Sequence, residues 1–151
     1  MAACALFREW EDPDPAELLR IELPVEAAYR PGRFFERELR PLLAVLEAAG
    51  RDFEALVIDG YVHLEEEAGK GLGTHLHEAL PYRPVVIGVA KNTLGVAADF
   101  VPVLRGRSRR PLYVSAIGCD LDEAARRVAE MHGPHRIPTL LRVVDEHARS
   151  G

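Results

Sequence analysis

Two short apolar segments constrain the fold of this chain more than any other feature. Residues 54–58 and 84–90 are almost wholly apolar, which is typical of strands that are buried on both faces of a sheet. Around them, apolar residues recur at three and four positions, the spacing of amphipathic helices. The alternation predicts an α/β layer fold with a mixed, mostly parallel central sheet and helices on both faces.

The expected order of elements is β-β-α-β-α-β-β-α-α. Strands are expected at residues 2–10, 16–23, 54–58, 84–90 and 110–118, of which 16–23 could instead form a short helix. Helices are expected at residues 34–49, 72–80, 120–132 and 135–151. Gly50 closes the first helix, which contains Pro41, and Asp120 is the expected N-cap of the third. The first two strands should pair as an antiparallel hairpin that joins the sheet.

Size and composition indicate one domain over residues 1–151. The chain has 48% hydrophobic residues and a net charge of −5, which lacks the global basic signature of a non-specific nucleic-acid binder. Its two cysteines, Cys4 and Cys119, fit neither a disulfide framework nor a zinc site. No apolar run approaches the ~20 residues of a membrane helix, and the first residues do not resemble a signal peptide. We therefore expect a cytoplasmic protein without a membrane segment.

Polar residues at the ends of the apolar runs are the first candidates for a site. Asp59 and Lys91 each directly follow one of these runs, and ligands of α/β sheets bind at the carboxyl ends of strands. Glu38 and Asp145, on predicted helices, would add the oxygen ligands that Mg²⁺ prefers. Each signal alone is weak, because an Asp-Gly pair after a strand is often only a turn.

Other polar groups have alternatives that the sequence leaves open. His75 and His77 would face different sides of a helix, so a shared zinc ion is not expected. Glu65–Glu67 form either a solvated turn or a replacement ligand set. The arginines are candidate phosphate contacts, although those after residue 104 could equally form a solvated loop: Arg30, Arg33, Arg105, Arg107, Arg109 and Arg110.

Six segments, in this order, resemble the endonuclease V family. They are YRPGRFFERELRPLL (29–43), LVIDG (56–60), GTHL (73–76), VVIGVAKNTL (85–94), PLYVSAIG (111–118) and HRIPTLLRVVD (135–145). The first and fourth are the strongest, since both their glycines and their spacing fit. The resemblance runs from about residue 2 almost to the end of the chain. It implies an RNase H-like fold and a DNA repair nuclease that uses Mg²⁺, or Mn²⁺, to cleave near deoxyinosine in DNA or inosine in RNA.

The resemblance also implies roles for individual residues. Glu38 and Asp59 match metal-binding carboxylates, and Asp145 lies where the family has histidine or aspartate. Lys91 matches a lysine expected near the scissile phosphate, which makes Glu38, Asp59 and Lys91 the implied catalytic residues. Tyr29 matches the tyrosine of a wedge that opens the DNA around a flipped base. The implied nucleic-acid-binding residues are Tyr29, Arg30, Pro31, Gly32, Thr74, His75 and Gly118.

The chain departs from the family pattern in four places. The family's first strand, with its catalytic aspartate, has no counterpart in residues 1–151. The wedge reads AYRP, the acidic segment 63–71 replaces a basic one, and the segment before residue 111 is short enough to lack a family hairpin. Three functions stay open: metal-dependent cleavage, binding of nucleic acid or a protein partner without cleavage, and binding of a small metabolite. An open sheet edge at the absent strand could also support a homodimer.

Overall fold

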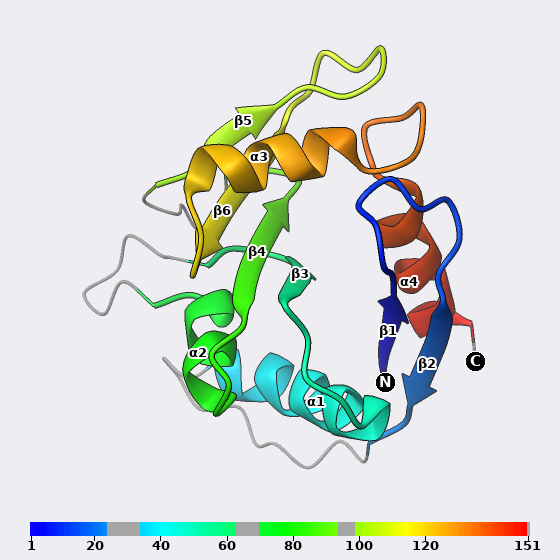
Figure 1. Cartoon of the computed structure of the whole chain (residues 1–151), viewed down its shortest axis with the longest axis vertical. Coiled ribbons are helices and arrows are strands. Elements are labelled where there is room, and N and C mark those ends of the chain that lie inside the picture. Colours follow the sequence, from blue (N-terminus) through cyan, green and yellow to red (C-terminus); the bar gives the residue numbers. More distant parts are fainter. Residues whose placement is uncertain (24–33, 63–69, 94–98, 151) are drawn as a thin grey trace.

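The computed structural model describes residues 1–23, 34–62, 70–93 and 99–150 (Figure 1). Its elements are β1 (Ala2–Leu6), β2 (Glu17–Ile21), α1 (Phe34–Ala49), β3 (Ala55–Asp59), α2 (Leu72–Ala79), β4 (Val85–Ala90), β5 (Val101–Val103), β6 (Leu112–Ile117), α3 (Leu121–Glu130) and α4 (Thr139–Arg149). The predicted elements are all present. Strand β5 is an addition that the sequence pattern did not reveal, because it has three residues and one of them is a proline.

The central sheet is mixed, as predicted. Its strand order is β3-β4-β6-β5. The β3–β4 pair is parallel, whereas β6 runs antiparallel to both β4 and β5. Among the described strands, parallel pairing is therefore less common than we expected, because β6 runs antiparallel to both of its neighbours.

The N-terminal hairpin differs from its prediction. Strands β1 and β2 pair antiparallel, with Ala2 opposite Ile21 and Leu6 opposite Glu17, as expected. They do not join the central sheet, however, and form a two-stranded sheet of their own. The hairpin instead packs on α4 and α1, and Figure 1 shows α4 beside β1 and β2. The homodimer expected through an open sheet edge stays a prediction.

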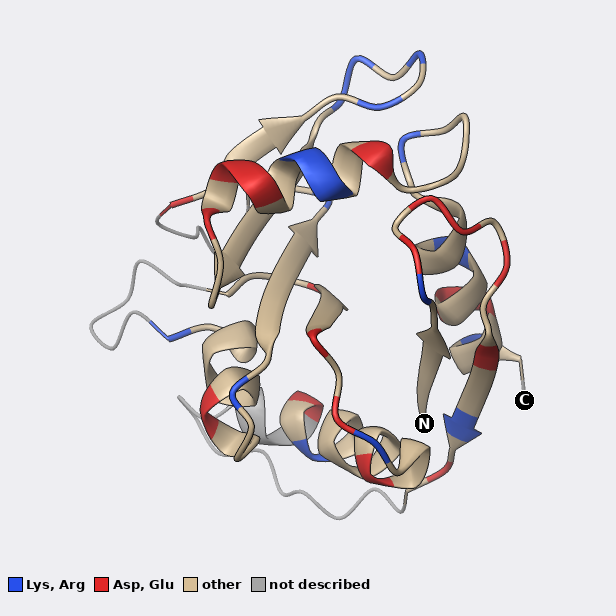
Figure 2. Ribbon diagram, viewed as in Figure 1, with Lys and Arg blue, Asp and Glu red and all other residues tan. Residues whose placement is uncertain are grey.

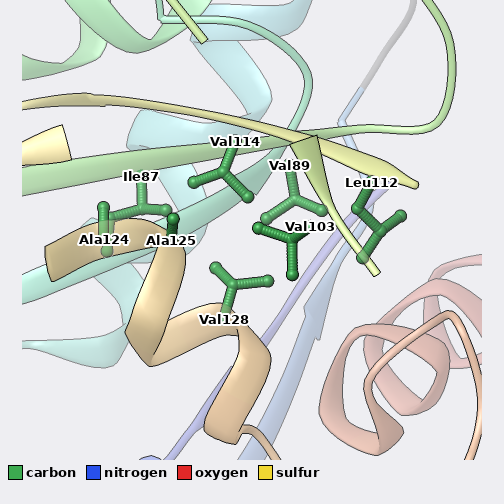
Figure 3. Packing of buried hydrophobic residues seen from close by; sticks show 8 residues of the cluster. All are labelled: Ile87, Val89, Val103, Leu112, Val114, Ala124, Ala125 and Val128. Atoms are coloured by element: carbon green, nitrogen blue, oxygen red, sulfur yellow. The ribbon is translucent and has the colours of Figure 1, made fainter. Parts of the chain in front are cut away.

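Helices cover both faces of the central sheet, which confirms the layer prediction. On one face, Ala124, Ala125 and Val128 of α3 point toward the valines, leucine and isoleucine of β4, β5 and β6 (Figure 3). On the other face, α1 and α2 pack on a cluster that includes Leu56, Ile58 and Val86. Because neighbouring strand residues point to opposite faces, the continuous apolar run of β4 serves both clusters.

The helix ends agree with the sequence signals in part. Gly50 closes α1 with a positive φ of 70°, which glycine adopts without steric cost. Asp120 is the N-cap residue of α3, as predicted, although its side chain makes no capping hydrogen bond. Acidic Asp122 and Glu123 do occupy the first turn of α3, where they favourably face the positive end of the helix dipole.

Two further observations bear on the predicted class of protein. Cys4 and Cys119 are both free thiols, as predicted. No helix in the part of the chain that the structure describes is long and apolar enough to cross a membrane.

Candidate functional site

Asp59 and Lys91 lie together at the carboxyl ends of two neighbouring parallel strands. Asp59 is the last residue of β3 and pairs in register with Val89 of β4. Its Oδ2 lies 3.8 Å from the Nζ of Lys91, and the two side chains are 67% and 46% exposed. Such an exposed ion pair stabilises the protein little. Figure 2 shows no charge along β4, β5 and β6, so charged groups are confined to the ends of these strands and to other elements.

The backbone after Asp59 is held by residues of neighbouring strands. Gly60 adopts a φ of +145°, which disfavours other residues there. Its N–H donates to the carbonyl of Val89 over 3.0 Å. The hydroxyl of Tyr61 donates to the carbonyl of Asn92, which ties the segment after β3 to the segment after β4. Burial raises the pKa of the Tyr61 hydroxyl, so it keeps its proton at neutral pH.

A buried hydroxyl from β6 completes this support. The Oγ of Ser115 accepts the N–H of Val62 over 3.0 Å, and Ser115 is fully buried. The carbonyl of Val62 in turn accepts the hydroxyl of Thr74 over 2.7 Å. The segment that follows Asp59 is thus anchored on two sides within the core.

The remaining predicted acids come from helices and reach the same space. A cavity of about 990 Å³ is lined by Glu38 of α1, Asp59, Lys91 and Asp145 of α4, among other residues. Asp145 also pairs with Arg149 one helical turn later, with its Oδ2 2.9 Å from the guanidinium. The structure therefore brings four residues that are distant in sequence to one cavity.

These residues do not by themselves form a complete metal site. Carboxylate oxygens are the donors that Mg²⁺ prefers, so the chemistry of Glu38, Asp59 and Asp145 fits. Within residues 1–23, 34–62, 70–93 and 99–150, however, no three histidine, cysteine or acidic side chains lie close enough together to hold a metal ion. The donors fit in kind, and metal binding by Glu38, Asp59 and Asp145 stays a prediction.

The residues expected to contact nucleic acid have mixed outcomes. Tyr29, Arg30, Pro31 and Gly32 lie outside the described residues, as do Arg33 and Glu65–Glu67. Thr74 is buried, with 6% exposure, and its hydrogen bond to Val62 gives it a structural role. A contact between Thr74 and nucleic acid stays a prediction without support from its position.

His75 and Gly118 differ in their surroundings. His75 is half-buried in α2, and desolvation lowers the pKa of its imidazole, so the ring is mainly neutral at pH 7. Gly118 has a φ of +90°, and a Cβ there would lie 3.2 Å from the Cα of Val85. The positive φ and the close approach of Val85 therefore explain why this turn has a glycine. A contact between Gly118 and nucleic acid stays a prediction.

Arg105 is not an exposed phosphate contact. It is 5% exposed, and its Nη1 donates to the carbonyls of His135 and Arg136 over 2.8 and 3.3 Å. Its Nη2 donates to Gly133 over 3.2 Å and to Met131. Burial lowers the pKa of this guanidinium, which still stays protonated at neutral pH. Arg105 therefore anchors the loop between α3 and α4, while its neighbours Arg107, Arg109 and Arg110 are exposed.

Sequence reasoning missed Arg136, which lies beside Lys91. The Nη2 of Arg136 donates to the carbonyl of Lys91 over 2.6 Å and to that of Pro111 over 2.9 Å. Its place just before a helix, in the segment HRIP, gave no local signal of this contact, because the contact joins residues 45 positions apart. A second cationic side chain thus borders the strand ends.

Solved structures of endonuclease V are similar to this chain. The Streptomyces avermitilis enzyme is 27% identical over 81% of this chain, with a TM-score of 0.62. The Bacillus subtilis enzyme is 22% identical over 89% of the chain, with a TM-score of 0.66. The Ciona intestinalis enzyme, in complex with a 24-mer DNA containing an inosine followed by a ribo-adenosine, is 18% identical over 91% of the chain, with a TM-score of 0.69.

These structures are longer than this chain. It spans 61% of the Streptomyces protein, 66% of the Bacillus protein and 73% of the Ciona protein. No protein-family profile and no curated protein sequence matches the chain. The shared architecture nevertheless agrees with the order of the sequence motifs, and on these grounds the chain is similar in fold to endonuclease V, with an RNase H-like architecture.

Proposed function

We propose that this protein binds inosine-containing nucleic acid at the carboxyl ends of β3 and β4. The observation that carries the proposal is the convergence of Glu38, Asp59, Lys91 and Asp145 on one cavity. Ligands of α/β sheets bind at such strand ends. The complex of the Ciona enzyme with inosine-containing DNA supports the same class of partner for a chain of similar fold.

Cations at this edge supply the attraction for a phosphate. The Lys91–Asp59 pair is exposed and weak, so a phosphate oxygen can replace the carboxylate as the partner of the ammonium. Arg136 borders Lys91 through a hydrogen bond to its carbonyl. Because the chain carries a net charge of −5, binding depends on these local cations, and we expect few phosphate contacts and a shallow dependence on salt.

Fluorescence anisotropy with end-labelled oligonucleotides tests this binding. A single-stranded DNA and an RNA, each carrying one inosine, are compared with otherwise identical oligonucleotides that carry adenosine. We expect tighter binding to inosine, and we expect Lys91→Met to weaken it roughly tenfold, the value of one lost charge-assisted contact. Lys70→Met is the matched control, since Lys70 is also exposed and pairs with Glu78 instead.

Two results would reject the binding proposal. One is the absence of binding to any of the four oligonucleotides. The other is equal affinity of the Lys91→Met and Lys70→Met variants, which would show that the strand ends are not the binding surface. The DNA and RNA arms also reveal which nucleic acid is preferred.

Cleavage that depends on Mg²⁺ or Mn²⁺ is the second candidate function. It is favoured by the three carboxylates that line the cavity, Glu38, Asp59 and Asp145. These would supply oxygen ligands to the ion, and Lys91 would pair with the phosphate. Since the described residues do not group into a metal site, we propose that cleavage requires more than these residues, whereas binding does not.

A nicking assay separates the two functions. Wild-type protein and Asp59→Asn are incubated with the inosine oligonucleotides in Mg²⁺, in Mn²⁺ and in EDTA. Removal of one negative charge beside Lys91 should leave binding equal or tighter, because Asp59 competes with phosphate for the ammonium. Cleavage by the wild-type protein but not by Asp59→Asn, and only in the presence of Mg²⁺ or Mn²⁺, would establish nuclease activity. Equal cleavage by the Asp59→Asn variant would rule out this site.

The free thiols support the cytoplasm as the proposed location. Cys4 and Cys119 form no disulfide with one another. Free thiols persist in reducing compartments. Detection of the native protein in the cytoplasmic fraction of cells would test this.

A further inference from the structure

A second pocket of the described protein lies between two connecting segments. Residues 104–111 join β5 to β6, and residues 131–138 join α3 to α4. The pocket between them has a volume of about 440 Å³ and is lined by Arg107, Ser108, Pro134, His135 and Arg136. None of these residues lines the cavity at the carboxyl ends of β3 and β4, so this pocket is a separate surface.

The two connecting segments carry positive charge and no acidic residue. Figure 2 shows basic residues along both of them. Their arginines are Arg105, Arg107, Arg109, Arg110 and Arg136. The ion pairs among the described residues are all made by other basic residues. In a chain with a net charge of −5, this local excess of positive charge attracts an anionic ligand.

Hydrogen bonds and close packing hold the two segments together. The buried guanidinium of Arg105 donates to four carbonyls of residues 131–136. Gly106 has a φ of +59°, and a Cβ there would overlap the carbonyl oxygen of Pro134, so this close approach requires glycine. The walls of the pocket are therefore fixed before a ligand arrives, which lowers the entropic cost of binding.

Two guanidinium groups beside this pocket have donors without a partner. The Nε atoms of Arg105 and Arg136 are buried and make no hydrogen bond within the described residues. The bonds of Arg136 to the carbonyls of Lys91 and Pro111 both come from its Nη2. Burial of charge that is not fully paired costs free energy, and an anion in the adjoining pocket would offset this cost.

The surroundings of the pocket favour a phosphate group of a nucleic-acid strand. Guanidinium groups bind phosphate oxygens in a planar, bidentate geometry. Ser108 and His135 add a hydroxyl and an imidazole that can donate hydrogen bonds. Arg136 also borders Lys91, where the proposed function places a phosphate. Since one side chain adjoins both sites, a strand that passes Lys91 can continue to Arg107.

We propose that this pocket binds a second phosphate of the nucleic-acid strand whose first phosphate pairs with Lys91. The inference rests on the proposed function and deepens it. Arg107 and Arg136 would hold the phosphate oxygens from the two connecting segments, and Ser108 and His135 would donate further hydrogen bonds. Phosphate contacts position a strand but carry no sequence information. The pocket would therefore set the register of the strand, and recognition of inosine would belong to the strand ends.

Inorganic phosphate tests the pocket without any nucleic acid. It is titrated into ¹⁵N-labelled protein at constant ionic strength, with sodium chloride as the reference, and amide chemical shifts are followed. Saturable shifts are expected for the amides of residues 107–108 and 135–136. In Arg107→Gln the Kd for phosphate should rise roughly tenfold, the value of one lost charge-assisted contact. Arg126→Gln is the matched control, since Arg126 is exposed and pairs with Glu123 instead.

Oligonucleotide binding at several salt concentrations tests the path of the strand. Fluorescence anisotropy is measured with the single-stranded inosine and adenosine DNA. Arg107→Gln should weaken both by the same factor, because a phosphate contact does not distinguish bases. The slope of log Kd against log salt concentration should fall by about 0.7, the value of one phosphate on a single strand. Arg107→Lys keeps the charge and should keep the slope, and Arg126→Gln should match the wild-type protein.

The variants separate this pocket from the proposed function. If Lys91→Met weakens binding while Arg107→Gln matches Arg126→Gln, the pocket is rejected and the proposed function stands. The reverse result would support a phosphate pocket and reject the strand ends as the binding surface.

Three further results would overturn the phosphate pocket. One is the absence of saturable shifts with inorganic phosphate. Another is an effect of Arg107→Gln on the inosine oligonucleotide alone, which would make Arg107 a base contact. The third is tighter binding of a poly-glutamate peptide than of the oligonucleotides at these amides, which would assign the pocket to an acidic protein.

Discussion

At the residue scale, the hydroxyl of Ser115 supports the segment that follows Asp59. It accepts the N–H of Val62 in the core. Ser115→Ala leaves this buried donor without its partner, and we expect it to lower the free energy of unfolding by about 1–3 kcal/mol. Urea unfolding followed by circular dichroism measures the change.

The matched control for Ser115 is Ser108→Ala. Ser108 also has a hydroxyl that bonds to the backbone, but it lies in an exposed turn, where this hydroxyl bonds to Arg110 two residues away. Its replacement should change the free energy of unfolding by less than about 0.5 kcal/mol. Equal effects of the two variants would show that Ser115 does not anchor the segment.

At the element scale, Arg105 fixes the loop that joins α3 to α4. Its guanidinium donates to four carbonyls of residues 131–136. Arg105→Leu removes these donors and should lower the free energy of unfolding by roughly 3 kcal/mol, since bonds to charged groups are the stronger ones. Arg107→Leu, in the same segment but exposed, should have an effect below about 0.5 kcal/mol. Thermal unfolding of the two variants compares them, and a similar loss in both would contradict the anchoring role.

The elements also show which parts of the structure the sequence can predict. Local signals sufficed for α1, whose bounds of Phe34–Ala49 match the expected helix and its closing glycine. They sufficed to place Asp59 and Lys91 at one edge as well, because these residues lie at the carboxyl ends of two neighbouring parallel strands. Arg105 was misjudged because arginine is rarely buried. The separation of the hairpin from the central sheet depends on tertiary pairing, which no local pattern encodes.

At the scale of the whole molecule, the contact between the hairpin of β1 and β2 and helix α4 has a consequence during synthesis. Arg20 of β2 donates to the carbonyl of His147 in α4, 127 residues later, and β1 packs on the same helix. At about 5–20 residues per second on the ribosome, the hairpin waits roughly 6–25 s before its partner helix is translated. During that interval its apolar face is uncovered, so the nascent protein passes through a period in which a chaperone can bind its N-terminal segment.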